Sequence, residues 1–223
     1  ALAAYILTDN LSTAMIILGI TVGMVFVAHP DMRPFIAVAA AGVILIVIGV
    51  LFLVATTKNS DSFRVMRVLV WLQPEKYSDE GGYQTLQALY AIGSGGLFGR
   101  GLGNSIQKLG SVPEAQNDMI FSIICEELGI FGGIFVLILF GYLLYRLFFI
   151  AQNAPDLFGS LIVTGIFIHI ALQVILNIAV VLNLMPNTGV ILPFISYGGT
   201  SIVFLMLEMA IALSVARQIK FQE

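Results

Sequence analysis

The chain has 223 residues, of which 59% are hydrophobic and only 10% are charged. Soluble domains have about 25% charged residues, so this composition excludes an ordinary soluble protein and indicates a polytopic membrane protein. The formal net charge is −3 and the basic residues form no tract, which argues against nucleic-acid binding. A single cysteine, Cys125, excludes an internal disulfide.

Five stretches are long and apolar enough to cross a bilayer, which takes about 20 residues in a helix. In chain order they are Leu11–Ala28, Phe35–Ala55, Met119–Tyr145, Leu157–Leu182 and Gly199–Ala216. The turn between the last two, Asn183–Gly198, is too apolar for a free loop and is broken by prolines and glycines. We expect a re-entrant turn packed against protein, because irregular backbone at membrane depth needs polar partners. The predicted fold class is therefore an all-α polytopic membrane protein.

The orientation follows from basic residues in the short connections. If the spans alternate, four of these residues fall on one side of the membrane: Arg33, Arg146, Arg217 and Lys220. Short cytoplasmic loops are enriched in Lys and Arg, so the C-terminus is expected to be cytoplasmic. The long segment 57–118 then lies outside, as part of one membrane domain that comprises residues 1–223.

Two short helices are predicted within this outer segment. Residues 60–74 have an amphipathic pattern typical of a helix at the membrane interface, which begins after Ser60 or Asp61 and ends before Pro74. The pattern of residues 83–99 predicts a second helix, which is ended by glycine. The glycine-rich GLFGRGLGNS follows no strand pattern, so it is not a dinucleotide-binding motif, and we interpret it as a flexible turn.

Acidic residues stand out in the third apolar stretch. On a continuous helix, Asp118 would share its face with Ser122, Cys125, Gly129 and Gly132. Such a smooth face accepts a close neighbour, either a helix or a substrate chain, although Asp118 could also simply cap the helix. Glu126 would lie roughly 12 Å deeper than Asp118. Glu126 and Glu127 would need a partner there, and a structural ion pair and a catalytic role both remain open.

Two further sets of polar residues are candidates for function. Arg64 and Arg67 would project from neighbouring faces of the predicted interfacial helix, where they could bind a diphosphate or extend to lipid headgroups. His169, Gln173 and Asn177 are spaced by four along one helix, which favours inter-helix hydrogen bonds, with a proton path as the alternative. No Cys/His cluster suggests a zinc site, and the sequence predicts no specific metal ligands.

Several of these segments together resemble the SEDS family (shape, elongation, division and sporulation). PEAQNDMIFSIICEELG is similar to the family motif PE-x-x-x-D-F-I-F-x-x-x-x-EELG, and FRVMR to its R-x-x-R. GGYQTLQALYAIGSGGLFGRGLGNSIQK and LMPNTGVILPFISYGGTS resemble its G-Y-Q…Q-K and M-P-x-T-G…S-Y-G-G-x-S segments. LTDNLSTAMII is similar to a fifth segment, but Asn10 stands where the family often has Asp, and Asp9 comes one place earlier.

The resemblance implies a fold of about ten spans, of which this chain resembles the C-terminal half. SEDS proteins polymerise lipid II into glycan strands at the outer face of the bacterial cytoplasmic membrane and use a divalent cation, Mg²⁺ or Mn²⁺. Their partner is a class B penicillin-binding protein, a transpeptidase. We therefore expect a multi-pass peptidoglycan glycosyltransferase that contacts lipid II and membrane lipid but no nucleic acid. The alternatives are a flippase for lipid-linked precursors and a non-catalytic scaffold of the division or elongation machinery.

The resemblance also assigns roles to individual positions. Asp118 matches the catalytic aspartate, and we expect it to be the general base. Candidate substrate-binding residues are Arg64, Arg67, Lys108, Glu114 and Ser196. A structural role around the site is expected for Glu126, Glu127, His169 and Gln173. Pro113 belongs to the same motif as Asp118, without a defined role.

Overall fold

The computed structural model describes residues 11–28, 63–80, 82–107 and 115–219, and in this part of the chain all regular secondary structure is helical. The helices are α2 (Leu11–Ala28), α4 (Phe63–Leu72), the short 3₁₀-helix η1 (Ser78–Glu80), α5 (Gly82–Gly95), α6 (Ile120–Asn153), α7 (Leu157–Val181) and α8 (Gly199–Ala216). The predicted all-α fold is confirmed.

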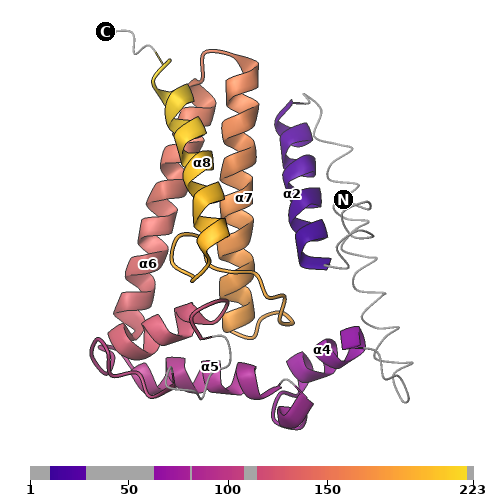
Figure 1. Ribbon diagram of the computed structural model, residues 1–223, viewed down its shortest axis with the longest axis vertical. Coiled ribbons are helices and arrows are strands. Elements are labelled where there is room, and N and C mark those ends of the chain that lie inside the picture. Colours follow the sequence, from indigo (N-terminus) through magenta and orange to yellow (C-terminus); the bar gives the residue numbers. More distant parts are fainter. Residues whose placement is uncertain (1–10, 29–62, 81, 108–114, 220–223) are drawn as a thin grey trace.

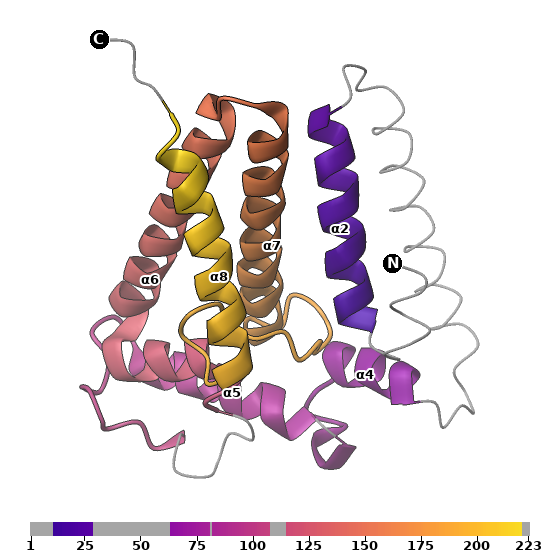
Figure 2. The same cartoon turned by 45° about the horizontal axis from the view of Figure 1, so that its top comes forward.

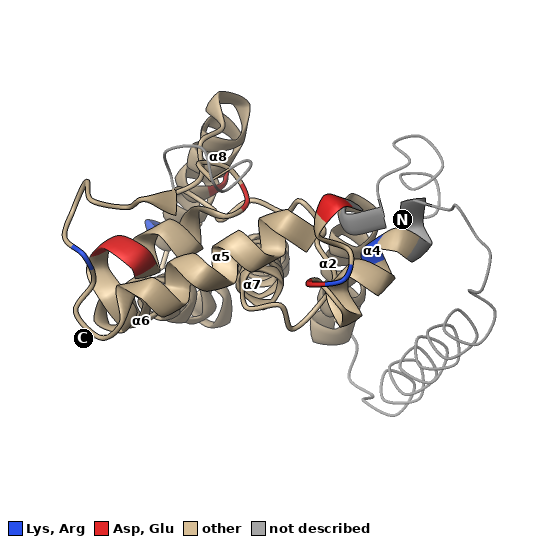
Figure 3. Ribbon diagram, turned by 90° about the horizontal axis from the view of Figure 1, so that it is seen from below, with Lys and Arg blue, Asp and Glu red and all other residues tan. Residues whose placement is uncertain are grey.

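The long helices stand side by side, and the short ones close one end of the bundle. α7 packs between α6 and α8 on one side and α2 on the other, whereas α4 and α5 lie across the end where α7 finishes (Figures 1 and 2). Seen from that end, α5 runs between α6 and α4 beneath α7 (Figure 3). The C-terminal end of α8 lies at the opposite end of the bundle. The described part of the predicted outer segment and the C-terminal end of α8 are thus at opposite ends of the bundle (Figure 1).

Three of the described helices, α6, α7 and α8, are long and apolar enough to cross a membrane, and α2 is a shorter apolar helix. The predicted bounds of α2 and α8 are confirmed, and α7 ends one residue before the predicted Leu182. The predicted span Phe35–Ala55 lies outside the described residues. α6 starts one residue after the prediction and continues eight residues past Tyr145, because the apolar run extends to Ile150.

Apolar residues occupy both the inside and the outside of the bundle. The interior between α6, α7 and α8 is filled by side chains such as Phe140, Val163, Ile170 and Leu205. Large apolar side chains are also exposed along the outer face of α6: Phe135, Ile138, Leu139, Tyr142 and Tyr145. In water this stripe would be an aggregation hazard, whereas in a bilayer it is the surface that lipid covers.

A break at Gly129 divides α6 into two helical parts. Gly129 has φ 72° and ψ −171°, a backbone conformation that is almost restricted to glycine. The first part lies across the end of the bundle beside α5, and only the second part rises through the bundle (Figures 1 and 2). The expectation of one continuous helix from Asp118 is therefore wrong, and so is the expected 12 Å depth of Glu126. Asp118 lies in a turn before α6, and the residues up to Gly129 stay near the same end.

Candidate functional site

Asp118 lies in the turn 115–119 that leads into α6, at the end of the bundle closed by α4 and α5. The residue is only 8% exposed. Its carboxylate oxygen Oδ1 accepts a hydrogen bond from Nε2 of Gln84 on α5, at 3.4 Å. A carboxylate held by a neighbouring helix has a restricted orientation, which is what positioned acid–base chemistry requires.

The backbone of this turn is fixed by its neighbours through three successive carbonyl oxygens. The side-chain amide of Asn177, on α7, donates to the Asp118 carbonyl at 2.7 Å. The Ser196 hydroxyl donates to the Asn117 carbonyl at 2.6 Å, and the Tyr197 backbone N–H donates to the Gln116 carbonyl at 2.8 Å. The Asp118 backbone is therefore held by α7 and by the turn that follows α7.

That turn, residues 183–198, has the packed re-entrant character predicted for it. Leu192 and Pro193 are fully buried, and the Leu192 N–H donates to the Ser196 hydroxyl at 2.8 Å. Asn177 donates to the Val190 carbonyl at 2.8 Å as well as to Asp118. One buried amide thus joins the re-entrant turn to the Asp118 turn. Because the Ser196 hydroxyl is buried and occupied by two backbone groups, its geometry favours a positioning role over the substrate contact expected for it.

Gln84 and Asn187 are functional candidates that sequence reasoning missed. The Asn187 side-chain amide donates to the Gln84 carbonyl oxygen at 3.0 Å, and the Gly189 N–H donates to Asn187 Oδ1 at 2.9 Å. Since the Gln84 oxygen accepts from Asn187, its NH₂ group is turned toward Asp118. Gln84 belongs to the segment GYQ and Asn187 to the segment MPNTG. The family resemblance of these two segments was the signal that could have pointed to both residues.

Glu126 is fully buried and anchors the loop that follows α5. Its carboxylate accepts hydrogen bonds from the Ser105 hydroxyl and from the backbone N–H groups of Ile106, at 3.2 Å, and Gln107, at 3.4 Å. Arg100 lies 3.7 Å away as an ion-pair partner. Charge neutralisation and several donors offset the cost of burying a carboxylate. The geometry favours the structural ion pair among the two roles left open for Glu126.

The same loop fills the break in α6. The N–H groups of Arg100 and Gly101 donate to the carbonyls of Glu126 and Glu127 at 2.9 Å each, and the Ile130 N–H donates to the Gly96 carbonyl. These bonds satisfy backbone groups that the break would otherwise leave unpaired. The glycine-rich segment is therefore a turn, as predicted, but it is hydrogen-bonded to α6 rather than free. Glu127 contributes its backbone carbonyl to this junction.

Other predicted substrate-binding residues are only partly described. Arg64 and Arg67 both lie on α4, and the Arg67 side chain is exposed. The Arg64 side chain lies outside the described part of the structure, as do Lys108, Pro113 and Glu114. The α4 helix runs from Phe63 to Leu72, inside the predicted range 60–74.

The polar stripe on α7 divides into two sites. His169 Nδ1 lies 2.9 Å from Glu208 Oε1 on α8, and Gln173 Nε2 lies 2.9 Å from His169 Nε2. These three side chains line a cavity of about 500 Å³ whose other walls come largely from apolar residues of α2 and α7. Asn177 belongs instead to the Asp118 site. The predicted inter-helix hydrogen bonds of the stripe are confirmed, and Glu208 is a partner that the sequence did not reveal.

Among the described residues, no group of three or more His, Cys, Asp or Glu side chains could hold a metal ion. These residues therefore do not form a carboxylate cage. Mg²⁺ commonly keeps several waters and binds through substrate phosphates with one or two carboxylates.

Membrane-length helices, a packed turn and a buried aspartate held at one end define an integral membrane protein with a candidate site at one end of its helical bundle. The family model described as cell cycle protein, which covers FtsW, RodA and SpoVE, matches residues 1–221. The chain belongs to this family, and the resemblance to SEDS proteins is confirmed.

Individual relatives agree with the family assignment. The chain is 41% identical to stage V sporulation protein E of Bacillus subtilis (strain 168), over 95% of this chain and 56% of that protein. It is 42% identical to the "Probable peptidoglycan glycosyltransferase FtsW" of the same strain, over 83% of this chain and 46% of that protein. The chain thus spans about half the length of these curated relatives.

A solved structure shows the same fold. It is described as the structural coordination of polymerization and crosslinking by a peptidoglycan synthase complex. One of its chains matches this one with a TM-score of 0.72 and 26% identity, over 99% of this chain and 59% of that chain.

Proposed function

We propose that the protein is a peptidoglycan glycosyltransferase that polymerises lipid II at the outer face of the cytoplasmic membrane, with Asp118 as general base. The observation that carries this proposal is the double restraint on Asp118. Its backbone is held by α7 and the re-entrant turn, and its carboxylate is held by Gln84 of α5. A residue that only capped α6 would not need its carboxylate directed by another helix.

The location of Asp118 suits a substrate whose lipid stays in the bilayer while its sugars lie outside. Asp118 sits at the end of the bundle, where the amphipathic helix α4 and the helix α5 lie across the span ends (Figure 1). Sugars attached to a membrane-embedded lipid would be presented at this level. The geometry therefore supports a reaction at the membrane surface.

The chemistry assigned to Asp118 is one proton transfer. Its carboxylate removes the proton from the acceptor sugar hydroxyl as that oxygen attacks the anomeric carbon of the donor. The new glycosidic bond forms as the bond to the diphosphate breaks, and the lipid diphosphate leaves with the bonding electrons. Such a single displacement inverts the anomeric configuration and needs one base.

The leaving diphosphate gathers negative charge that must be stabilised as it develops. The guanidinium groups of Arg64 and Arg67 on α4 are assigned to this task, since Arg binds phosphate oxygens through two N–H groups at once. A divalent cation, bound mainly by the diphosphate, would add positive charge to the same group.

The partner in this proposal is a class B penicillin-binding protein that crosslinks the glycan strands. Support comes from the matched chain in the solved complex, which is described as coordinating polymerization and crosslinking. We place the protein in the bacterial cytoplasmic membrane with its C-terminus in the cytoplasm.

A flippase is the second candidate, and one observation favours it. The His169, Gln173 and Glu208 side chains line the open cavity between α2 and α7. Intramembrane ionisable groups often mark a transport path. The remaining walls of this cavity are mainly apolar, however, and a headgroup with two sugars and a diphosphate would need many more polar contacts.

A lipid II polymerisation assay tests the proposal. Full-length protein and its partner transpeptidase, with the partner's crosslinking blocked, are incubated with lipid II, with and without Mg²⁺. Glycan strands that form only with the cation are expected. If no glycan forms, yet lipid II crosses vesicle membranes, the flippase is supported; neither activity would point to a scaffold.

A further inference from the structure

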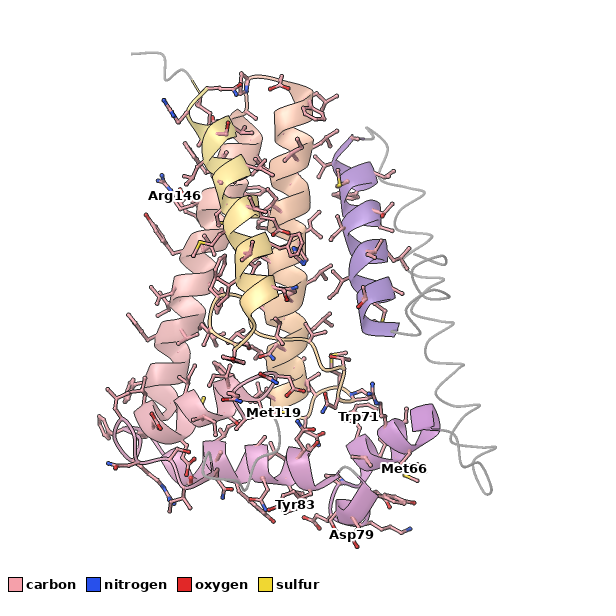
Figure 4. The ribbon with its side chains drawn as sticks, viewed as in Figure 1. Met66, Trp71, Asp79, Tyr83, Met119 and Arg146 are labelled. Carbon is pink, nitrogen blue, oxygen red and sulfur yellow. The ribbon has the colours of Figure 1, made fainter. Side chains whose placement is uncertain are left out.

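The helix α4 is joined to the turn after α7 by a reciprocal pair of hydrogen bonds. The indole Nε1–H of Trp71 donates to the backbone carbonyl of Asn183 at 3.0 Å. The side-chain amide of Asn183 donates to the backbone carbonyl of Trp71 at 3.4 Å. Figure 4 shows Trp71 at the end of α4 that lies nearest this turn, and Met66 farther along the helix.

Asn183 follows the C-cap of α7 and is held there by backbone hydrogen bonds. Its φ is 55°, the left-handed conformation that commonly follows the last helical turn and that Asn adopts more readily than most residues. Its N–H donates to the Val180 carbonyl at 2.9 Å, and the next N–H, from Leu184, donates to the Ala179 carbonyl at 2.7 Å. The Asn183 backbone, whose carbonyl accepts from Trp71, is thus fixed to the end of a membrane-spanning helix.

The same turn also reaches the Asp118 carboxylate. Four residues after Asn183, Asn187 donates to Gln84, and Gln84 donates to Asp118. On α4, Arg67 precedes Trp71 by four residues, which places both on neighbouring positions of one helix face. The first residues of the re-entrant turn are therefore a common support for the candidate base and for the helix that carries the arginines.

We propose that Trp71 and Asn183 form a positioning latch, which holds α4 and therefore Arg67 at a fixed place relative to Asp118. The inference rests on the proposed glycosyltransferase function. In that reaction the base acts at the acceptor hydroxyl and the arginines act at the leaving diphosphate. The two must act on one substrate pair at the same time, so a misplaced α4 lowers the rate of the chemical step.

Two conservative variants each remove one of the two hydrogen bonds of the latch and spare its surroundings. Trp71→Phe keeps an aromatic ring and loses the N–H donor, and Asn183→Gly keeps the left-handed backbone and loses the side-chain amide. Each is expected to lower kcat about fivefold, the rate equivalent of one neutral hydrogen bond, with little change in KM for lipid II. Ser160→Ala is the matched control, because it removes one hydrogen bond, to the Ala151 carbonyl, at the other end of α7.

The fluorescence emission of Trp71 tests the contact with Asn183 independently of enzymatic activity. Trp71 is the single tryptophan of the 223-residue chain, and the difference spectrum between wild type and Trp71→Phe isolates it from any other tryptophan in the assay. Asn183→Gly keeps the carbonyl that accepts from the indole but removes the amide that holds the Trp71 carbonyl. The end of α4 is then held less firmly, so the indole is expected to gain solvent and its emission to shift to longer wavelength. Unchanged emission would overturn the latch.

A double-mutant cycle decides whether Trp71 acts through Arg67. Trp71→Phe is measured in the wild-type and in the Arg67→Gln backgrounds, with rates expressed per folded molecule. A latch predicts about a fivefold loss in wild type and little further loss after Arg67→Gln. Equal losses in both backgrounds, with a wild type that polymerises lipid II, would overturn the latch alone. A wild type that does not polymerise would reject the proposed function and this role with it.

Discussion

At the scale of single residues, the restraints on Asp118 are separable. The contacts from Asn177, Ser196 and Tyr197 are made to backbone carbonyls, whereas the Gln84 amide donates to the carboxylate. A change of the Asp118 side chain therefore leaves the backbone restraints in place. The position of the turn and the chemistry of the acid can be tested by different substitutions.

Gln84→Met tests the orientation of the acid. Methionine has a similar length and no hydrogen-bond donor, so the carboxylate loses the group that directs Oδ1. We expect polymerisation to fall by about tenfold or more, since a hydrogen bond to a charged group, worth about 1.5–3 kcal/mol, is lost while the base itself remains. The folded yield, measured by size-exclusion chromatography in detergent, should stay near wild type.

Gln87→Met is the matched control, because Gln87 lies on the same helix one turn farther on. It should polymerise lipid II at the wild-type rate. Equal rates for Gln84→Met and Gln87→Met would show that Gln84 does not orient the base.

At the scale of elements, the junction between α5 and α6 depends on close backbone contact. A Cβ atom on Gly129 would lie 2.3 Å from the Leu97 carbonyl oxygen, and one on Gly99 would lie 2.2 Å from the Glu127 carbonyl oxygen. Because both residues lack a side chain, the loop comes close enough to hydrogen-bond the backbone groups that the break in α6 would leave unpaired. The loop is then anchored from the other side by Glu126. This junction sets the angle between the two parts of α6.

Gly129→Ala should break this junction. Alanine at this φ and ψ is strained by about 1–3 kcal/mol, and its methyl group would collide with the backbone of the loop. We expect a large drop in thermal stability and in folded yield. In contrast, Gly141 lies in the second part of α6 with open space around it. Gly141→Ala should therefore leave the stability unchanged or raise it slightly. Similar melting temperatures for the two variants would argue against the junction.

The elements differ in how far the sequence predicts them. α2, α7 and α8 were predicted within one residue, because long apolar runs with polar or glycine boundaries leave few other choices in a membrane. The break in α6 was missed because Gly129, Gly132 and Gly133 look alike in sequence. Only the approach of the loop after α5 distinguishes Gly129.

The candidate site, too, could be predicted from the sequence only in part. Asp118 and the re-entrant turn were predicted, the first through family resemblance and the second from its apolar, broken composition. The hydrogen-bond chain through Asn187 and Gln84 was not predicted, because its members are 103 residues apart and only the packing of α5 under the turn brings them together. The pairing of His169 with Glu208 on another helix was missed for the same reason.

At the scale of the whole molecule, the proposed function requires the Asp118 end of the bundle to face outward. Asn104 is exposed in the loop after α5, and Gln152 is exposed near the opposite end of α6. In a Cys125→Ser background, Asn104→Cys should react with a membrane-impermeant maleimide in intact protoplasts. Gln152→Cys, the matched control, should react only after permeabilisation. The reverse labelling pattern would place Asp118 in the cytoplasm.

The most direct test of the central claim is the polymerisation rate of purified Asp118→Asn with its partner transpeptidase. Asparagine keeps the size of the side chain and all the backbone contacts of the turn, and it removes the base. Loss of a general base typically lowers a rate by about 10²–10⁴-fold. The account predicts a loss of this size with normal folding and partner binding, whereas Asp156→Asn, which alters the cap of α7, should remain active. Glycan synthesis by folded Asp118→Asn at the wild-type rate would contradict it.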